Sequence, residues 1–405
     1  MTEGALSGLK ILEYSEFIAG PYCTKLLADL GAEVIKMEKP GFGDKARSFG
    51  PFPQDIPHPE KSGLFLFLNT NKLGITLNLE TATGVKIFRE MAKQVDVIVE
   101  DHAPREMERL GLNYESLHNI NSRLVVTSIT PFGQEGPYRD FKTCNLVNFC
   151  VSGLAYTNPA TGVGDIEQDP PLKLPLRVAD YRIGLIGAIC TMLAVIARQA
   201  TAFGQHVDLS QQEAMALQAC GEVAQYTCEG FAYSRRQGGR PTGSTVYPSK
   251  DGYVFLNAGT NVFWTGLMNM IGNPSWAQEE WCQDQALRRQ NWDALELLIT
   301  EWTRQHTTEE VEQAAMTERV PCSAVQSVKD AVNSEHLRVR EFFVDIDHRE
   351  AGRLRYPGAP SKFSATPWRV DRPAPLLGEH NEQVYRGMLG YTRQDLVKLR
   401  QAGVI

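Results

Sequence analysis

The stretch Lys10–Met37, KILEYSEFIAGPYCTKLLADLGAEVIKM, predicts a strand, a helix and a second strand in turn. Lys10–Tyr14 and Glu33–Met37 are short segments with Ile, Leu or Val at their centres, which is typical of buried strands. Tyr22–Leu30 between them has a helical pattern, and Gly31 is a common helix stop. Because a helix connects the two strands, we expect them to pair in parallel.

The same alternation continues to about residue 130. Further strands are expected at Ile75–Leu79, Val95–Val99 and Leu124–Ile129, with short helices between them. A parallel sheet of this kind is covered by helices on both faces and binds ligands beyond the carboxyl ends of its strands. The sequence therefore predicts an α/β protein with a Rossmann-like parallel sheet.

The length of 405 residues is enough for two or three domains of roughly 100–200 residues each. The polar, glycine-bearing segment Ser234–Lys250 leads into a strand at Tyr253–Asn257, then amphipathic helices, then a strand at Cys322–Val325. We expect a large domain built from both chain ends, residues 1–224 and 326–405. A smaller α+β domain is expected at residues 225–325.

Charge and hydropathy exclude several classes of partner. The chain has 41 Lys+Arg against 48 Asp+Glu and no run of five basic residues, so we expect neither nucleic acid nor a membrane surface as a partner. The longest apolar run, Ile183–Ala197, is shorter than the roughly 20 residues of a membrane-spanning helix and predicts a buried helix. No secretory signal pattern is visible, so a cytoplasmic protein is expected.

Metal and nicotinamide cofactors are not indicated. The eight cysteines never form a CxxC pair, and the eight histidines do not cluster at ligand spacing, so we expect free thiols and no metal site. Gly41–Ala46 matches G-x-G-x-x-A, but prolines surround it and no strand leads directly into it, so NAD binding is not expected. The lysines near the first strands still allow a local pocket for a phosphorylated ligand.

Asp180 is the most informative single residue, because it directly precedes Tyr181-Arg182 and the apolar helix Ile183–Ala197. An aspartate at this spacing commonly caps the helix through the free amides of its first turn. The same amide dipoles favour the ionised carboxylate, which can act as a covalent nucleophile. The residue alone leaves both interpretations open. Gly20-Pro21 is similarly either a plain strand-to-helix turn or a close approach for an anionic ligand.

Several blocks in a fixed order resemble the class III CoA-transferases, also called the formyl-CoA or carnitine CoA-transferase family. The match runs over essentially the whole chain. The blocks are GLKILEYSEFIAGPYCTKLLADLGAEVIKMEKPGFGD (8–44), LNTNKLGITLNL (68–79), VDVIVEDHAPREMERLGL (95–112), SITPFGQEGP (128–137), RVADYRIGLIGAICTMLAVIARQATAFGQHVDLS (177–210), VPCSAV (320–325) and PLLGEHN (375–381).

The resemblance implies that Asp180 is the nucleophile and carries CoA as an aspartyl thioester. It implies CoA as a substrate, with no permanently bound cofactor. The positions that match CoA-binding segments of the family are Ile18, Ala19, Lys39, Lys72, Leu77, Asn78, Glu80, Asp101, His102, Ala103, Arg109 and Thr130. Lys39, Lys72 and Arg109 are expected near the CoA phosphates. His102 stands where many relatives have an aromatic residue.

The acyl acceptor is suggested by departures from the family pattern. Ile18 stands where formyl-CoA:oxalate enzymes have glutamine, and their glycine-rich loop is reduced here to residues 238–243, which argues against oxalate. Arg182, Arg235, Arg236 and Arg240 could pair with a second carboxylate. We therefore expect succinyl-CoA as donor and a dicarboxylate such as malate, citramalate or benzylsuccinate as acceptor. Carnitine-type acceptors stay open.

Two alternatives share the same fold. The α-methylacyl-CoA racemases carry a His-Asp pair where this chain has Thr143–Asn148, TCNLVN, so the partner for two-base proton transfer is missing. Some family members act as scaffolding subunits, but the presence of Asp180 favours an active chain. The resemblance also implies an interlocked homodimer, or a heteromer with a paralogous subunit.

Overall fold

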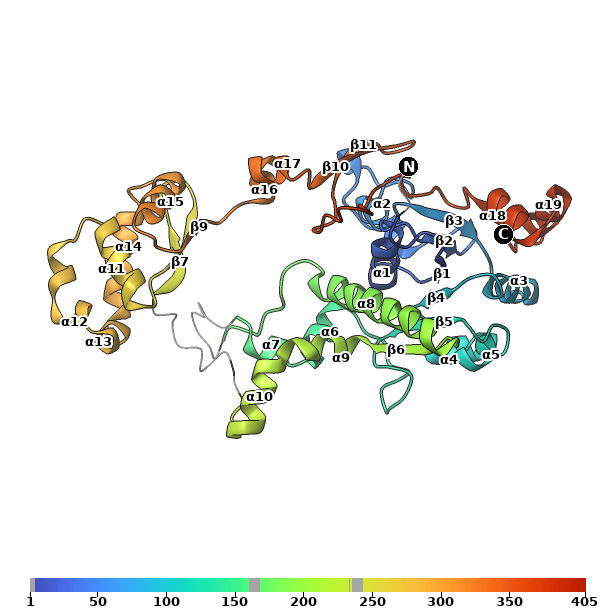
Figure 1. Ribbon diagram of the computed structural model, residues 1–405, viewed down its shortest axis with the longest axis horizontal. Coiled ribbons are helices and arrows are strands. Elements are labelled where there is room, and N and C mark those ends of the chain that lie inside the picture. The colour runs from blue at the N-terminus through green and yellow to red at the C-terminus, as the bar shows by residue number, and fades with distance from the viewer. Residues whose placement is uncertain (1–3, 160–167, 233, 235–242) are drawn as a thin grey trace. The chain divides into compact units, whose positions relative to one another are not determined.

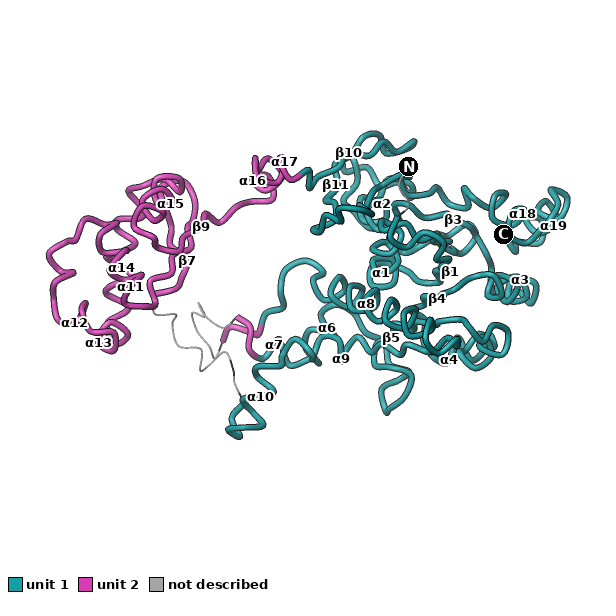
Figure 2. The backbone as a smooth tube through the Cα atoms, in the orientation of Figure 1, with its two compact units in different colours: residues 1–156, 172–232, 341–405 teal, residues 157–171, 233–340 magenta. Residues whose placement is uncertain are grey.

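The computed structural model describes residues 4–159, 168–232, 234 and 243–405. These fall into two compact units, shown in Figure 2. Unit 1 contains residues 1–156, 172–232 and 341–405, and unit 2 contains residues 157–171 and 233–340. The domain limits expected from the sequence, with the smaller domain at 225–325, stay a prediction.

A six-stranded parallel sheet forms the centre of unit 1 (Figure 1). Its order is β3-β2-β1-β4-β5-β6, and every neighbouring pair is parallel. This confirms the α/β class. The strands are β1 Lys10–Tyr14, β2 Glu33–Glu38, β3 Lys72–Thr76, β4 Val97–Glu100, β5 Val125–Thr130 and β6 His206–Ser210. Chain order reverses between β1 and β4, and ligands bind at such switch points in open α/β sheets.

Helices cover both faces of this sheet, as expected for a parallel arrangement. One face packs against α1 (Ala19–Ala28) and α8 (Val178–Thr201) through a core that includes Ile11, Val97 and Ile183. The other face packs against α3 (Ala82–Ala92), α4 (Pro104–Leu110), α5 (Tyr114–His118), α18 (Asn381–Leu389) and α19 (Arg393–Gln401). The remaining helices of unit 1 are α2 Gly63–Leu68, α6 Asn145–Val151, α9 Gln211–Ala216 and α10 Cys220–Glu229, while α7 Leu154–Thr157 lies at the unit boundary.

Two elements differ from their predicted bounds. The third strand was expected at Ile75–Leu79, but it ends at Thr76. Leu77 and Leu79 are buried beyond its carboxyl end, and their alternation with polar residues resembled a strand pattern. The long helix begins at Val178 rather than after Asp180. Arg177 is its N-cap residue, and Asp180 lies inside the first turn. The interpretation of Asp180 as the helix cap is therefore wrong.

The helix α8 is long and apolar enough to cross a membrane by length and composition alone, and no other described helix meets that test. Core helices meet the same test, and 44% of its most apolar window is buried inside the protein. The buried face includes Ile183, Gly187 and Thr191. The opposite face exposes large apolar side chains, at Leu185, Ile189, Leu193 and Ile196.

The chain returns to unit 1 after residue 340 and covers the edge strand β3. A hairpin of β10 (Phe343–His348) and β11 (Gly352–Pro357) comes first. His380 N then donates to Gly74 O at 2.9 Å, and Thr76 N donates to Asn381 Oδ1 at 2.8 Å. Residues near the C-terminal end of the sequence thus complete the hydrogen bonding of a strand near its start.

Unit 2 has a three-stranded antiparallel sheet with order β7-β8-β9. Its strands are β7 Ser244–Pro248, β8 Tyr253–Asn257 and β9 Cys322–Ala324. One sheet face and the surrounding helices share a core that contains Leu256, Leu267 and Leu295. The helices are α11 Asn261–Met270, α12 Glu280–Gln283, α13 Gln285–Gln290, α14 Trp292–Thr303, α15 Thr308–Thr317, α16 Val328–Asn333 and α17 Glu335–Val339.

Candidate active site

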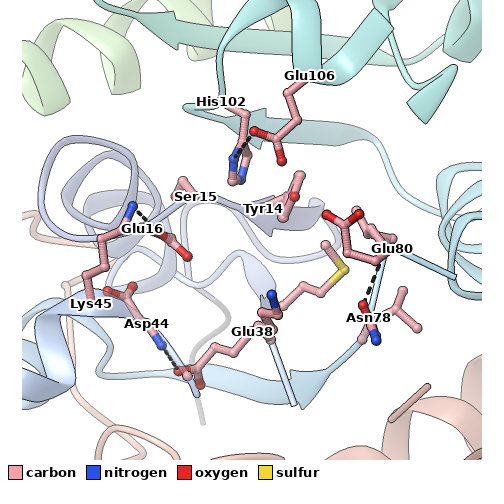
Figure 3. A pocket seen from close by; sticks show the side chains of 15 residues that line it. Tyr14, Ser15, Glu16, Glu38, Asp44, Lys45, Asn78, Glu80, His102 and Glu106 are labelled. Atoms are coloured by element: carbon pink, nitrogen blue, oxygen red, sulfur yellow. Dashed lines mark hydrogen bonds and ion pairs between the residues drawn. The ribbon is translucent and has the colours of Figure 1, made fainter. Parts of the chain in front are cut away.

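A pocket of about 240 Å³ opens at the carboxyl ends of β1, β2 and β3 and beside the start of α4 (Figure 3). We call it the sheet-end pocket. Five of the predicted CoA contacts line it together: Lys39, Leu77, Asn78, Glu80 and His102. The other lining residues are Tyr14, Ser15, Glu16, Met37, Glu38, Gly43, Asp44, Lys45, Leu79 and Glu106. A pocket therefore lies at the switch point of the sheet, where ligands bind in open α/β sheets.

A buried charge network lies beneath this pocket. Lys36 Nζ is 2.9 Å from Glu13 Oε1 and 2.7 Å from Asp44 Oδ2, and all three side chains are almost completely buried. Burial alone would raise the pKa of Glu13, but Lys36 and Lys72 lower it to about 2. Glu13 is therefore ionised at neutral pH. The network holds the end of β1 and the loop at Asp44 in fixed positions.

Lys72 belongs to this network and not to the pocket. Its ammonium is fully buried, 2.8 Å from Glu13 Oε2, and it donates to Pro21 O at 2.8 Å and Asn69 Oδ1 at 2.9 Å. All three donors have partners inside unit 1. The expected contact between Lys72 and a CoA phosphate is therefore inconsistent with the structure. The partners that bury it come from distant parts of the sequence, which a local pattern cannot show.

The turn between β1 and α1 contains Ile18 and Ala19, and two carboxylates hold it. Phe17, with a φ of 72°, donates its backbone N–H to Asp44 Oδ1 at 2.9 Å. Glu16 N donates to Asp101 Oδ1 and Oδ2, both at 3.1 Å. The side chains of Ile18 and Ala19 are buried, so a ligand at this turn meets mainly backbone. The predicted residues Ile18, Ala19 and Asp101 thus lie together beside the sheet-end pocket.

His102 presents a neutral ring to the pocket. It stacks on Tyr14 with 3.7 Å between ring centroids, and burial lowers its pKa to about 4. Its Nε2 is buried without a hydrogen-bond partner, and Nδ1 is 3.8 Å from Glu106 Oε2. Its backbone N–H donates to Glu100 Oε2 at 2.8 Å, which fixes the start of this loop. A flat, neutral ring in this position suits stacking rather than charge pairing.

The remaining predicted contacts lie at the rim or outside the pocket. Arg109 is half-exposed, 3.2 Å from Glu80 Oε1, in a neighbouring hollow of about 350 Å³ that shares Leu79 and Glu80 with the sheet-end pocket. Ala103 is the exposed residue before α4. Thr130 ends β5 as a fully buried side chain and does not line the pocket.

Asp180 is 9% exposed and lies in the first turn of α8. Burial raises the pKa of its carboxyl group, and the amide of Asn145 and the charges of Arg177 and Lys173 oppose that rise. Arg177 Nη1 is 3.7 Å from Asp180 Oδ2, which is an ion pair but too long for a hydrogen bond. Asp180 Oδ2 and Asn145 Nδ2 are both buried without a regular hydrogen bond. Asn145 and Arg177 are nevertheless close enough to the carboxylate to lower its pKa.

A cavity of about 650 Å³, which we call the Arg177 cavity, is lined by Arg177 and Tyr181 on either side of Asp180 in the sequence, although Asp180 itself does not line it. Two cations, Lys173 and Arg177, line it together with Asn145. The rest of its wall is mostly apolar, from Phe49, Gly50, Leu64, Cys144, Leu146, Leu176 and Tyr181. Sequence reasoning missed Arg177, because the helix was predicted to begin after Asp180. A helix start one turn earlier would have placed Arg177 beside the carboxylate.

Other expectations can be placed more briefly. Arg182 is not among the residues that line the Arg177 cavity. Arg235, Arg236 and Arg240 lie outside the described residues, as does most of the loop 238–243. Among the residues that the structure describes, no group of three or more His, Cys, Asp or Glu side chains could hold a metal ion.

The six-stranded parallel sheet and the pocket at its carboxyl end define an α/β protein with a ligand site at the end of its sheet. The model of CoA-transferase family III matches residues 6–381, and the chain belongs to that family. The predicted family is thereby confirmed.

Relatives with known names agree with this assignment. The chain is 34% identical, over all of both sequences, to a formyl-CoA:oxalate CoA-transferase of Streptomyces coelicolor. It is 29% identical to a succinyl-CoA–D-citramalate CoA-transferase of Chloroflexus aurantiacus, over 99% of this chain and 98% of that one. A crystal structure of a CAIB/BAIF family protein from Brucella suis superposes with a TM-score of 0.85 and 26% identity, covering 96% of this chain and all of the other. The chain is thus a transferase that uses CoA thioesters.

Proposed function

We propose that this chain transfers CoA from succinyl-CoA to a second dicarboxylic acid through a thioester on Asp180. The observation that carries the proposal is the carboxylate of Asp180, which is buried. Its Oδ2 has a 3.7 Å ion pair with Arg177 but no regular hydrogen bond, and its neighbours Arg177 and Tyr181 line a cavity with two cations. A carboxylate in such a place can act as a nucleophile once it is ionised. Its position in the first helical turn favours the ionised form.

The reaction consists of four exchanges at carbonyl carbons. An Asp180 oxygen attacks the donor thioester, so a C–O bond forms, the C–S bond breaks and CoA leaves as thiolate. The thiolate attacks the Asp180 carbonyl carbon of the mixed anhydride, which releases succinate and leaves Asp180 as a CoA thioester. The acceptor carboxylate and then the thiolate repeat these steps in the reverse sense. Each step replaces one activated acyl linkage by another, so no ATP is needed.

The sheet-end pocket is the proposed site for the nucleotide part of CoA. Lys39 and Lys45 line it, and Arg109 lies in the adjoining hollow, so cations are available for phosphate groups. His102, stacked on Tyr14, offers a flat surface to the pocket. The turn at Ile18 and Ala19 would then run beside the pantetheine arm toward the reactive carbonyl.

The proposed dicarboxylate acceptor is supported by the relatives. Citramalate and oxalate, named for the two relatives above, both carry two carboxylates. The cations of the Arg177 cavity add a place for a second carboxylate on this chain. Malate, citramalate and benzylsuccinate fit that description, and Ile18 in place of glutamine disfavours oxalate.

A second copy of the chain, or a paralogous subunit, is the proposed partner of unit 1 in an interlocked dimer. Large apolar side chains are exposed along α8, at Leu185, Ile189, Leu193 and Ile196, and on α10, at Val223 and Tyr226. An apolar stripe of this length is unusual for a free surface and typical of an interface between subunits.

The proposed mechanism is tested by trapping the intermediate. After incubation with succinyl-CoA, mass spectrometry should find CoA attached to the protein, and hydroxylamine should convert the adduct to a hydroxamate on Asp180. Asp180→Ala should form no adduct and lose CoA exchange, whereas Asp347→Ala, at an exposed position on β10, should behave as wild type. Wild-type exchange by Asp180→Ala would refute the mechanism. Deuterium uptake at an α-carbon without exchange would instead indicate a racemase.

A further inference from the structure

We propose that Arg177 selects the acceptor by binding its second carboxylate while the first attacks the thioester on Asp180. This inference rests on the proposed function and adds a specificity-determining residue to it. Arg177 is the N-cap residue of α8, one helical turn before Asp180. It lines the Arg177 cavity, and 39% of its side chain is exposed there.

The guanidinium of Arg177 has unused hydrogen-bonding capacity. Its nearest carboxylate oxygen, Asp180 Oδ2, is 3.7 Å away, and no described residue accepts a hydrogen bond from it. An arginine has five N–H donors in a flat fork that matches a carboxylate. The group is therefore a charged donor set that pairs only loosely with Asp180 and keeps N–H donors for a ligand.

Aromatic stacking fixes the direction in which this fork points. The guanidinium lies over the ring of Phe17 at 4.5 Å and near the ring of Phe49 at 5.6 Å. The two rings contact each other edge to face at 4.8 Å. Stacking occupies the face of the guanidinium and leaves its N–H edge for a ligand. Because Asp44 holds the backbone of Phe17, the stack is tied to the turn at Ile18.

Lys173 is the weaker candidate in the same cavity. Its ammonium donates to Leu174 O at 3.0 Å and to Leu176 O at 2.8 Å, so backbone carbonyls already take two of its three donors. It adds positive charge to the cavity without offering a bidentate contact. The direct contact with a carboxylate is therefore assigned to Arg177.

The charge of Asp180 changes during the reaction, so Arg177 can pair first with Asp180 and then with the acceptor carboxylate. While Asp180 is a free carboxylate, Arg177 pairs with it and favours its ionised form. When Asp180 becomes a thioester it loses its charge, and Arg177 is left beside a neutral group. A carboxylate from the acceptor then restores the pairing. Once CoA has moved to the acceptor, Asp180 is ionised again and competes for Arg177, which helps the product to leave.

The test separates loading of the thioester from its discharge. Wild type, Arg177→Leu and Arg177→Lys are loaded with succinyl-CoA, freed of excess donor, and discharged with succinate or with butyrate, which lacks the second carboxylate. Arg177→Leu is expected to lose about 100-fold in kcat/KM for succinate and less than about threefold for butyrate. Arg177→Lys should recover part of the preference. Arg349→Leu, at an exposed turn, is the control for loss of one positive charge and should match wild type.

The outcomes distinguish the two proposals. If wild type never carries CoA on Asp180, the proposed function fails. If wild type loads but Arg177→Leu keeps the succinate preference, or if Arg182→Leu loses it instead, the role of Arg177 is refuted. Because loading from succinyl-CoA is the reverse of discharge to succinate, Arg177→Leu should also load more slowly from that donor, whereas loading from butyryl-CoA should stay near wild type. If a variant that circular dichroism shows to be folded loses loading from both donors equally, Arg177 acts only on Asp180, which also overturns the inference.

Discussion

At the scale of single residues, unit 1 holds two buried carboxyl groups whose pKa values are shifted in opposite directions. Glu13 is fully buried, but two lysines keep it ionised, with a pKa of about 2. Asp180 is also buried, and its pKa is raised because Arg177 and Asn145 only partly offset the loss of solvation. The difference lies in the partners: Glu13 has direct ion pairs at hydrogen-bond distance, and Asp180 does not. The first carboxylate belongs to a structural ion-pair network, and the second is the proposed nucleophile.

The raised pKa of Asp180 predicts the acid limb of the pH profile. Only the ionised carboxylate attacks, so kcat/KM for thioester formation should fall as pH drops through the pKa of Asp180, above the ordinary value of 3.8. Arg177→Leu removes a positive charge that lowers this pKa. In the variant, the fall in kcat/KM at low pH should therefore occur at a higher pH than in wild type. Loading rates with succinyl-CoA from pH 4 to pH 8 check this. An identical limb in both proteins would show that Arg177 does not act on Asp180.

At the scale of secondary-structure elements, the pairing of α1 with α8 positions the reactive residues. Gly184 allows this contact, because a Cβ at that position would lie 2.5 Å from Ala19 O. The carbonyl belongs to the backbone of the turn that is proposed to run beside the CoA arm. The distance between Asp180 and that turn therefore depends on the absence of a side chain at Gly184.

Gly184→Ala is predicted to reduce activity more than it reduces folding. The new methyl group must push α1 away from α8, and a shift of about 1 Å at a reactive centre can cost roughly 100-fold in rate. Gly187→Ala, one turn later, is the matched control, because its Cβ would meet only side-chain atoms of Ile129 and Cys23, the nearest at 3.0 Å. Loading rates and melting temperatures of both variants should be compared. Equal loss of activity in both would contradict the role given to Gly184.

Elements whose bounds depend on local sequence were predicted well, whereas those that depend on contacts between distant residues were not. The strands β1, β2, β4 and β5 were predicted to within a few residues, since each is a short apolar run. The third strand was misplaced because Leu77 and Leu79 are buried by the sheet end rather than by a strand. Lys72 was expected near the CoA phosphates, but the fold brings Glu13 and Pro21 to its ammonium group, which a local pattern cannot show. The family was predicted correctly from motifs. The position of Arg177 beside Asp180 could be recognised only from the true start of α8.

At the scale of the whole molecule, the proposed dimer makes a prediction about α8. Ile189 is 51% exposed in the middle of the apolar face, so Ile189→Glu should weaken subunit association while unit 1 keeps its fold. Val397→Glu, at an exposed apolar position on α19, is the matched control. Sedimentation velocity at micromolar concentration would measure both. A wild-type protein that sediments as a fully active monomer would rule the dimer out.

The return of the chain to strand β3 has a consequence for synthesis on the ribosome. Thr76 and Asn381, which hydrogen-bond each other, are 305 positions apart. At ordinary translation rates, β3 emerges roughly 15–60 s before the segment that covers it. During that interval the nascent chain carries an open sheet edge, the kind of surface that other chains can extend. We therefore expect the emerging N-terminal half to associate with chaperones until the C-terminal segment has been made.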